Sequence, residues 1–359
     1  MMADSWLDQW PAAYQPATCE QCDWILLLPP AQLGDRCPHC GQAGFAALDP
    51  NADRPVYTQP PELVAPFGLS REKREQALHN FTRRGWFAPE DLTVARLNGR
   101  LHPLYLPMWL VDADVTAVWQ AEMGFDYQVV SHRERYQNGR WQSQEVRETR
   151  VRWEPRLGQV QRHYDNSRAP ALEEQPQLDR ALGRYQLDET RPYAAAQLNG
   201  TLVRLPNRPP DDAWTDAELA IKKRAITDCQ TAAQADHLRD FRWTAEFHNR
   251  HWTQLLYPVY VTHYRDDEGH SYPVLINGQT GQLSGTFRAS SQRAWRVSKW
   301  IGVGTAVLLL LTLLLLLLAN FLEPQLLPLA SLTLLLALVT GAAAFIPPIL
   351  ARQTNRKPG

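Results

Sequence analysis

The chain has 359 residues, enough for two or three units that each bury a core or pack on a neighbour. Hydrophobic residues make up 44% of it, which is ordinary for a globular protein, although leucine is concentrated near the C-terminus. The formal net charge of −1 excludes a strong global field that would draw the whole chain onto nucleic acid or anionic lipid.

The N-terminal segment has no basic region followed by an apolar one, so we expect no cleavable signal peptide. Four of the five cysteines lie close together in two CxxC pairs, which favours a metal site over a disulfide framework. The simplest interpretation is a reducing, cytoplasmic environment for this part of the chain.

The first predicted element is a zinc ribbon. Cys19, Cys22, Cys37 and Cys40 have the spacing C-x2-C-x14-C-x2-C, one residue short of the most frequent four-cysteine range. Four thiolates enclose Zn²⁺ tetrahedrally and leave no open position for water or substrate. Gly41 follows the second pair and can take the positive φ that such knuckle turns often need. We expect one structural Zn²⁺ here, with a redox dithiol as the alternative.

Residues 49–66 are rich in proline and predict a linker with extended stretches. A helix is expected from Ser70, its N-cap, to about residue 85, and a second one over residues 215–241, where apolar residues recur at spacings of three and four. Cys229 lies in this second helix, where we interpret it as a small apolar residue.

Most of the remaining middle of the chain has strand character. The dipeptide Asn-Gly is a strong hairpin signal, and it occurs at residues 98–99, 138–139, 199–200 and 277–278. The segment "SYPVLINGQTGQLSGTF" is the clearest hairpin. "YLPMW" followed by "GFDYQVV" resembles "LYPVY" followed by "GHSYPVL", which suggests an internal duplication and two related antiparallel sheets.

Two long apolar stretches lie near the C-terminus. Residues 301–319 carry no charge and are long enough, as a helix, to cross the hydrocarbon core of a bilayer. Residues 326–351 form a second uncharged stretch, and the short segment between them contains Glu323. We therefore expect a transmembrane helical hairpin, and neither of its two spans contains an ionisable residue for a transport path.

Basic residues flank this hairpin on one side. They are Arg288, Arg293, Arg296 and Lys299 before the first stretch, and Arg352, Arg356 and Lys357 after the second. The positive-inside rule then places both termini and the main domain on the cytoplasmic side of the inner membrane.

Candidate catalytic residues are weak. Asp112 and Asp114 would face one side of a strand, and His248 and His251 lie three residues apart, but neither pair forms a recognised catalytic pattern. The chain has no Gly-Lys pair for a phosphate-binding loop and no serine-hydrolase or reactive-cysteine signature. We expect no ATPase, helicase or hydrolase activity.

Several segments resemble a bacterial family of membrane-anchored proteins with a TFIIB-type zinc ribbon, often labelled primosomal helicase-like. They are "SREKREQALHNFTRRGWFAPEDL", "LYLPMWLVDADV", "LLYPVYVTHYR" and "INGQTGQLSG". The four cysteines match the zinc ligands of that family, whereas residues 155–215 depart most from it. The resemblance implies a role in membrane stress, in which phage-shock protein A-like or flotillin-like (SPFH) proteins are recruited to the membrane.

The expected fold is α+β, with an N-terminal zinc ribbon, a central, mostly antiparallel β domain with a few helices, and a C-terminal transmembrane hairpin. The expected divisions are a tail (1–14), the ribbon (15–48), the linker (49–66), the α+β domain (67–298), the hairpin (299–351) and a basic tail (352–359).

Two functions from different classes fit this organisation. The first is a membrane-anchored adaptor that recruits partner proteins, with homo-oligomers left open. The alternative is membrane-tethered binding of nucleic acid by the ribbon and by residues 131–168, where nine arginines are interleaved with tyrosine and tryptophan. Acidic residues also occur in that segment, so a solvated sheet face with cross-strand ion pairs, such as Glu148 with the neighbouring Arg150 or Arg152, is the simpler interpretation.

Overall fold

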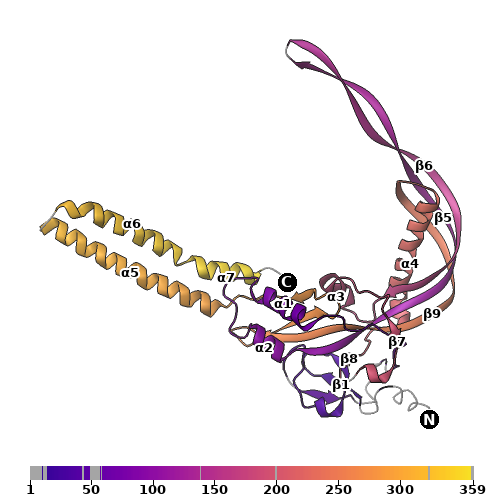
Figure 1. Cartoon of the computed structure of the whole chain (residues 1–359), viewed down its shortest axis with the longest axis horizontal. Helices are drawn as coiled ribbons and strands as arrows, with labels where there is room; N and C mark the ends of the chain where they lie inside the picture. Colours follow the sequence, from indigo (N-terminus) through magenta and orange to yellow (C-terminus); the bar gives the residue numbers. More distant parts are fainter. Residues whose placement is uncertain are drawn as a thin grey trace.

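A computed structural model shows a mixed α+β head from which two long apolar helices project (Figure 1). The expected α+β class is therefore confirmed. The strands of the described residues form one 11-stranded, mainly antiparallel sheet rather than two related sheets. The structure describes residues 10, 14–42, 44–48, 57, 59–137, 139–198, 200–321 and 324–356. Much of the expected N-terminal tail and linker lies outside these residues.

The main path of the sheet runs in the order β11-β10-β9-β5-β8-β2-β1-β3, while β6 pairs with β5, and β4 pairs with β7 and β9. The β5–β8 and β4–β9 pairs are parallel, and the other pairs are antiparallel. The strands are β1 Gln15–Cys19, β2 Ile25–Leu28, β3 Phe45–Ala47, β4 Leu63–Val64, β5 His102–Gln137, β6 Arg140–Ala169, β7 Arg191–Pro192, β8 Leu202–Arg204, β9 His237–Arg265, β10 Ser271–Asn277 and β11 Leu283–Gly285.

The N-terminal cysteine unit is part of this sheet. Its strand β1 lies between β2 and β3, and β2 pairs with β8 through Leu26↔Arg204 and Leu27↔Val203. Leu26 is fully buried in the same core cluster as Leu104 of β5. The unit is thus joined to the head by backbone hydrogen bonds and by a shared core, which fixes its position relative to the rest of the sheet.

The longest strands, β5 and β6, end in a projecting ribbon, and we call its outer part, residues 125–137 and 139–152, the arm. β5 and β6 pair from Trp109↔Ala169 to Gln137↔Arg140, so the hairpin expected at residues 138–139 is confirmed. β9 accompanies β5 only as far as the pair Gly124↔His237, and beyond this point the two-stranded ribbon extends alone (Figure 1).

One face of the three long strands is covered by α4, Pro210–Ala232. Its buried residues recur every fourth position and are mostly small, which brings the helix axis close to the sheet: Ala213, Ala217, Ile221, Ala225 and Cys229. The expected burial of Cys229 as a small apolar residue is confirmed.

The expected extent of this helix was wrong at both ends. It begins earlier, at Pro210, and ends at Ala232 rather than at residue 241. Residues from His237 onward pair with β5, and their side chains alternate between exposed and partly buried positions. Residues 237–241 form a strand because they pair with β5, even though their apolar residues also have helical spacing.

The other local predictions have mixed outcomes. Helix α1, Arg71–Thr82, begins as expected after Ser70, whose side chain accepts a hydrogen bond from the amide of Lys73. The turn at residues 277–278 joins β10 to β11 as expected. Residues 98–99 instead end helix α2, Val94–Gly99, and Gly200 lies in a turn before β8, so neither forms a hairpin.

The two segments proposed as a duplication are adjacent in the sheet. Tyr105 pairs with Pro258 and Leu106 pairs with Tyr257 across the antiparallel β5–β9 ladder. Their continuations differ, because Gly124 lies inside β5 whereas Gly269 lies in the turn before β10. A duplication remains a hypothesis.

The C-terminal helices are α5 Ser291–Phe321, α6 Leu327–Ala343 and α7 Ile346–Arg356, and the first and the continuous 327–356 segment are candidate membrane spans. They pack on each other through small residues and through hydroxyl pairs, Thr312–Thr333 at 2.9 Å and Thr305–Thr340 at 3.1 Å. Most of their leucine side chains are exposed, as lipid-facing residues would be. The remaining short helices are α3 Gln175–Leu182, η2 Pro30–Gln32, η3 Ala195–Gln197 and η4 Pro324–Leu326.

Candidate metal centre

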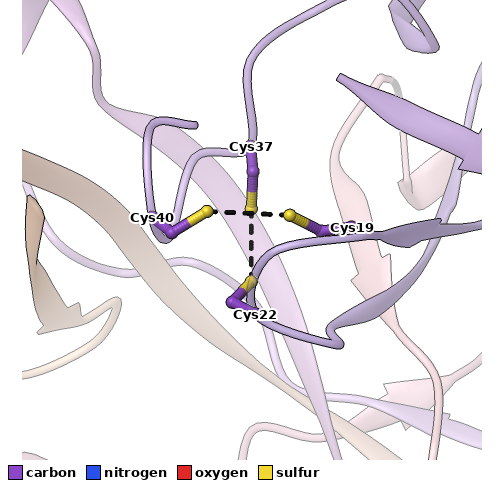
Figure 2. A group of neighbouring side chains, drawn as sticks. All are labelled: Cys19, Cys22, Cys37 and Cys40. Carbon is purple, nitrogen blue, oxygen red and sulfur yellow. Dashed lines mark hydrogen bonds between the residues drawn. The ribbon is translucent and has the colours of Figure 1, made fainter. Parts of the chain in front are cut away.

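The four cysteines of the two CxxC pairs converge on one point (Figure 2). Cys19 is the last residue of β1, Cys22 lies in the turn between β1 and β2, and Cys37 and Cys40 come from the segment before β3. Their sulfur atoms all lie within 4.8 Å of one another, with Cys19–Cys40 at 3.6 Å and Cys22–Cys37 at 3.7 Å. The expected grouping of these residues is confirmed.

The spacing of the sulfur atoms fits a tetrahedral metal ion. Sulfurs about 2.3 Å from a central Zn²⁺ would lie roughly 3.8 Å from one another, whereas a disulfide needs about 2.05 Å. All four cysteines are free. Four sulfur ligands complete a tetrahedron, and Cys19 and Cys37 are fully buried, so such a site is closed to substrate.

Both cysteine turns are shaped by the backbone. The amide of Cys19 donates to the carbonyl of Trp24 at 3.0 Å, and the amide of Gly41 donates to the carbonyl of Cys37 at 2.7 Å. Gly41 has φ +66°, as expected, and a Cβ at this position would collide with the imidazole of His263. Glycine is therefore required at residue 41 both by the turn and by the contact with β9.

Hydrogen bonds favour a thiolate at Cys37. The thiol of Cys22 and the amides of Cys40 and His39 donate to its sulfur, and these hydrogen bonds outweigh burial and lower the pKa of Cys37 below its usual value. The same hydrogen bond raises the pKa of Cys22, which supplies the proton. Such a cluster readily loses protons to a divalent cation, since metals bind the thiolate form.

A buried arginine lies beside the cluster. The guanidinium of Arg204 stacks 4.1 Å above the ring of Trp24, whose other neighbour is the imidazole of His39 at 3.9 Å. Arg204 is only 4% exposed and forms an ion pair with Glu174. A divalent ion held by four thiolates carries a net charge of −2, so this arginine is placed to balance it. Arg204 was not predicted from the sequence, although a charged residue inside the apolar stretch 202–205 was the available signal.

The second cysteine turn is also bound to the long strands. The imidazole of His263 donates to the carbonyl of Pro38 at 3.2 Å, and Arg265 donates to the carbonyl of Gly41 at 2.9 Å. A polar cavity of about 540 Å³ lies at this junction, and its wall includes Asp91 and Arg100. The cluster is thereby connected to β9 and to α2 as well as to β8.

The carboxylate of Asp91 connects three arginines at this junction. It accepts two hydrogen bonds from Arg100, at 2.6 and 2.8 Å, one from Arg96 at 3.2 Å and one from the amide of Arg265 at 2.9 Å. Burial opposes ionisation, but these donors outweigh it and lower the pKa of Asp91 to about 2.

The weak catalytic candidates are brought together on the open face of the sheet. Asp112 pairs with His251 and Asp114 pairs with His248 across β5 and β9. The carboxylate of Asp114 accepts from His163 and Asn249, both at 2.8 Å, and is about half exposed. That of Asp112 accepts from the amide of Asn166 at 2.6 Å. These contacts lie where the register of the β5–β6 and β5–β9 ladders shifts, and they stabilise the irregular backbone there.

The arginine-rich segment 131–168 lies in the arm and in the rest of β6. Many of its charges pair along the strand, as in Arg150–Glu148 at 3.4 Å and Arg156–Glu154 at 2.6 Å. Glu148 pairs with Arg150 as expected, but this ion pair runs along β6 rather than across two strands, and Arg152 pairs with Glu154 instead. Asp266, Glu268 and His270 also lie within 4.8 Å of one another, on an exposed turn.

Comparison with known proteins gives no match to a family model, to a curated protein or to a solved structure.

Proposed function

We propose that this chain is a membrane-anchored adaptor. Its head, stabilised by a structural Zn²⁺, would lie at the cytoplasmic face of a membrane and recruit partner proteins there. Three features support the proposal: the closed four-cysteine centre, the two apolar helices, and the rigid connection between them.

Zinc is the metal that suits the cysteine centre best. Four thiolates in a tetrahedral arrangement favour Zn²⁺ or an iron–sulfur centre, and ribbon spacings of this kind are typical of structural Zn²⁺. The ion would be held by Cys19, Cys22, Cys37 and Cys40, and would stabilise a unit whose own core is small. Elemental analysis of the purified protein should give one zinc per chain, and Cys37→Ser should lose it.

The flanks of the apolar helices support the expected orientation. Arginines and a lysine cluster before and within the start of α5 and at the end of α7, while Trp295 and Trp300 are exposed on the first turns of α5. Basic residues favour the cytoplasmic side, and tryptophan favours the interface between lipid and water. Both ends of the hairpin would then lie in the cytoplasm with the head.

The connection between head and helices carries the proposal. β11 leads into α5, and α7 returns to the same place, where Asn355 exchanges hydrogen bonds of 2.8 and 3.1 Å with Ala289. From there the ladder β11-β10-β9-β5-β8-β2-β1 continues without a break to Cys19. The cysteine centre is thus held at a fixed place relative to the helices, as a docking surface at a membrane requires.

The partner class comes from the family resemblance of the sequence. It implies proteins of the phage-shock protein A-like or flotillin-like (SPFH) type, acting in membrane stress. Purification of the tagged, full-length protein in mild detergent, followed by mass spectrometry, should recover such proteins. Recovery of none of them would contradict this partner class.

Membrane-tethered binding of nucleic acid is the second candidate, and one observation favours it. Tyr136 and Trp141 are exposed beside three arginines at the tip of the arm, and exposed aromatics with arginine stack on single strands. The same purification tests it, because nucleic acid that is released steeply with salt, in the absence of protein partners, would favour this function.

A further inference from the structure

The outer part of the β5–β6 ribbon has no support from the rest of the head. This outer part is the arm, residues 125–137 and 139–152, which lies beyond the last pair that β9 makes with β5. None of the arm residues whose side chains are described is buried. Thirteen residue pairs give the arm a length of about 44 Å. A two-stranded ribbon of this length is marginal by itself in water, so a surface that receives it would stabilise it.

The end of the arm carries an exposed aromatic pair. Tyr136 and Trp141 are opposite each other, with ring centroids 5.3 Å apart, and are 60% and 69% exposed. Val130, on the same face, is also exposed. Aromatic residues of this size cover much apolar area, and their placement at the extreme end of a projecting element suggests a contact made by the tip.

The tip is also positively charged. Between residues 131 and 142 the chain has three arginines and one glutamate, a net charge of +2 with histidine neutral. Closer to the head the balance changes, because Glu145 pairs with Arg147 and Glu148 pairs with Arg150. The net positive charge is therefore concentrated at the same end of the arm as Tyr136 and Trp141. By the alternation along each strand, Arg133, Arg135 and Arg140 lie on the opposite face of the ribbon from the aromatic pair, so an anionic surface met by the end of the ribbon would contact both groups.

We propose that the tip of the arm docks on the anionic surface of the membrane that α5 and α6 cross. Tryptophan and tyrosine favour the headgroup region, and arginine is attracted to anionic lipid. The inference rests on the proposed membrane anchoring, which keeps the tip close to that surface and raises its effective concentration there. In Figure 1 the arm curves back toward the side from which α5 and α6 project, as such a contact needs.

Two other occupants fit the arm less well. A second copy could add a strand along the free edge of β6, but alternating arginine and glutamate side chains along this edge oppose strand addition. Nucleic acid bound along the arm would need a longer row of stacking residues than one aromatic pair. It would also meet the acidic residues closer to the head, Asp126, Glu145 and Glu148, which a contact made by the end of the arm avoids.

The test uses the full-length protein in vesicles, with an environment-sensitive fluorophore at one new cysteine. Ser143→Cys places the label beside Trp141, and Thr149→Cys places it about 20 Å further down the same face of β6. Both variants also carry Cys229→Ala. The Cys229→Ala protein without a new cysteine is treated with the same fluorophore, and its labelling measures any reaction of the four metal-binding cysteines. Vesicles of phosphatidylcholine, with or without phosphatidylglycerol, carry a nitroxide on the lipid headgroup as quencher.

Docking predicts that headgroup nitroxide quenches the label at residue 143 several-fold more than the label at residue 149 in anionic vesicles. Quenching at residue 143 should fall in neutral vesicles or at high salt. It should be lost in Tyr136→Ser/Trp141→Ser and retained in Tyr127→Ser, the matched change at the base of the arm.

Equal, weak quenching at both positions in anionic vesicles would overturn the inference. So would protection of residue 143 by an oligonucleotide in place of lipid, or quenching that appears only at high protein density, which would indicate a second copy. Flotation with the vesicles in alkaline carbonate tests membrane anchoring on the same samples, and partner capture tests the adaptor function. Failure of the anchor or of the adaptor is thereby distinguished from failure of the contact made by the arm.

Discussion

At the scale of single residues, charged side chains connect the cysteine turns to the rest of the head. Arg204 stacks on Trp24 next to the first cysteine turn, and Asp91 accepts hydrogen bonds from three arginines, one of which, Arg265, also contacts the second cysteine turn. The cysteines themselves were predicted from their spacing alone, because a closed metal site needs its ligands at short, regular intervals. Arg204 and Asp91 were not, since their roles depend on strands that are distant in the sequence.

Asp91→Asn should lower the stability of the head by about 2 kcal/mol at neutral pH, from the size of its pKa shift. Its carboxyl group is only 15% exposed, so little of this effect is screened by solvent. The pKa is about 2 in the folded chain against 3.8 ordinarily, so the stabilisation is present above about pH 4 and is lost as the pH falls toward 2.

Thermal unfolding midpoints of parent and variant, measured from pH 7 down to pH 2, check this prediction. The difference between them should be largest at neutral pH and should shrink through the acid range. Glu90→Gln, at the neighbouring exposed carboxylate, is the matched control and should show no such difference. A constant difference at every pH would show that the loss is not due to the charge of Asp91.

At the scale of elements, the long strands and α4 form one structural unit. Ile221 is the largest buried residue in the row of small residues that α4 presents to the sheet, where it lies in a core with Val115 and Ala117. The helix was predicted from its apolar spacing, but its end was not, because residues 237–241 fit both periods until a partner strand is present.

Ile221→Ala should lower the free energy of unfolding by about 2–4 kcal/mol, because it leaves a cavity between α4 and the sheet. Leu219→Ala on the same helix is the control, since Leu219 is 51% exposed and its truncation should change stability by less than about 0.5 kcal/mol. Thermal unfolding compares the two. Equal effects would contradict the assigned packing of α4.

At the scale of the whole molecule, the two ends were predictable and their connection was not. The hydropathy of residues 301–351 and the spacing of the cysteines each depend on local sequence. The pairing of β2 with β8, which joins the cysteine unit to the sheet, brings together residues that are far apart in the sequence, such as Leu27 and Val203. Local sequence patterns carry little information on such pairings. The turn signal at residues 138–139 likewise gave no indication that β5 and β6 are so long.

This connection is the basis of the adaptor proposal, since it holds the four-cysteine centre at a fixed position relative to the two candidate membrane spans. The most direct test compares partner capture by the full-length parent, Cys37→Ser and Cys229→Ser. Cys37 is a candidate metal ligand, whereas Cys229 is buried in α4 and distant from the centre, so the two changes are chemically matched.

We predict that all three proteins remain in the membrane fraction, and that the parent and Cys229→Ser contain one zinc per chain and recover the same partner proteins. Cys37→Ser should lose both the metal and the partners. Normal recovery of partners by a zinc-free Cys37→Ser protein would contradict a recruiting role for the ribbon and would assign the contact to the α+β domain. Absence of any protein partner from the parent itself would contradict the adaptor function.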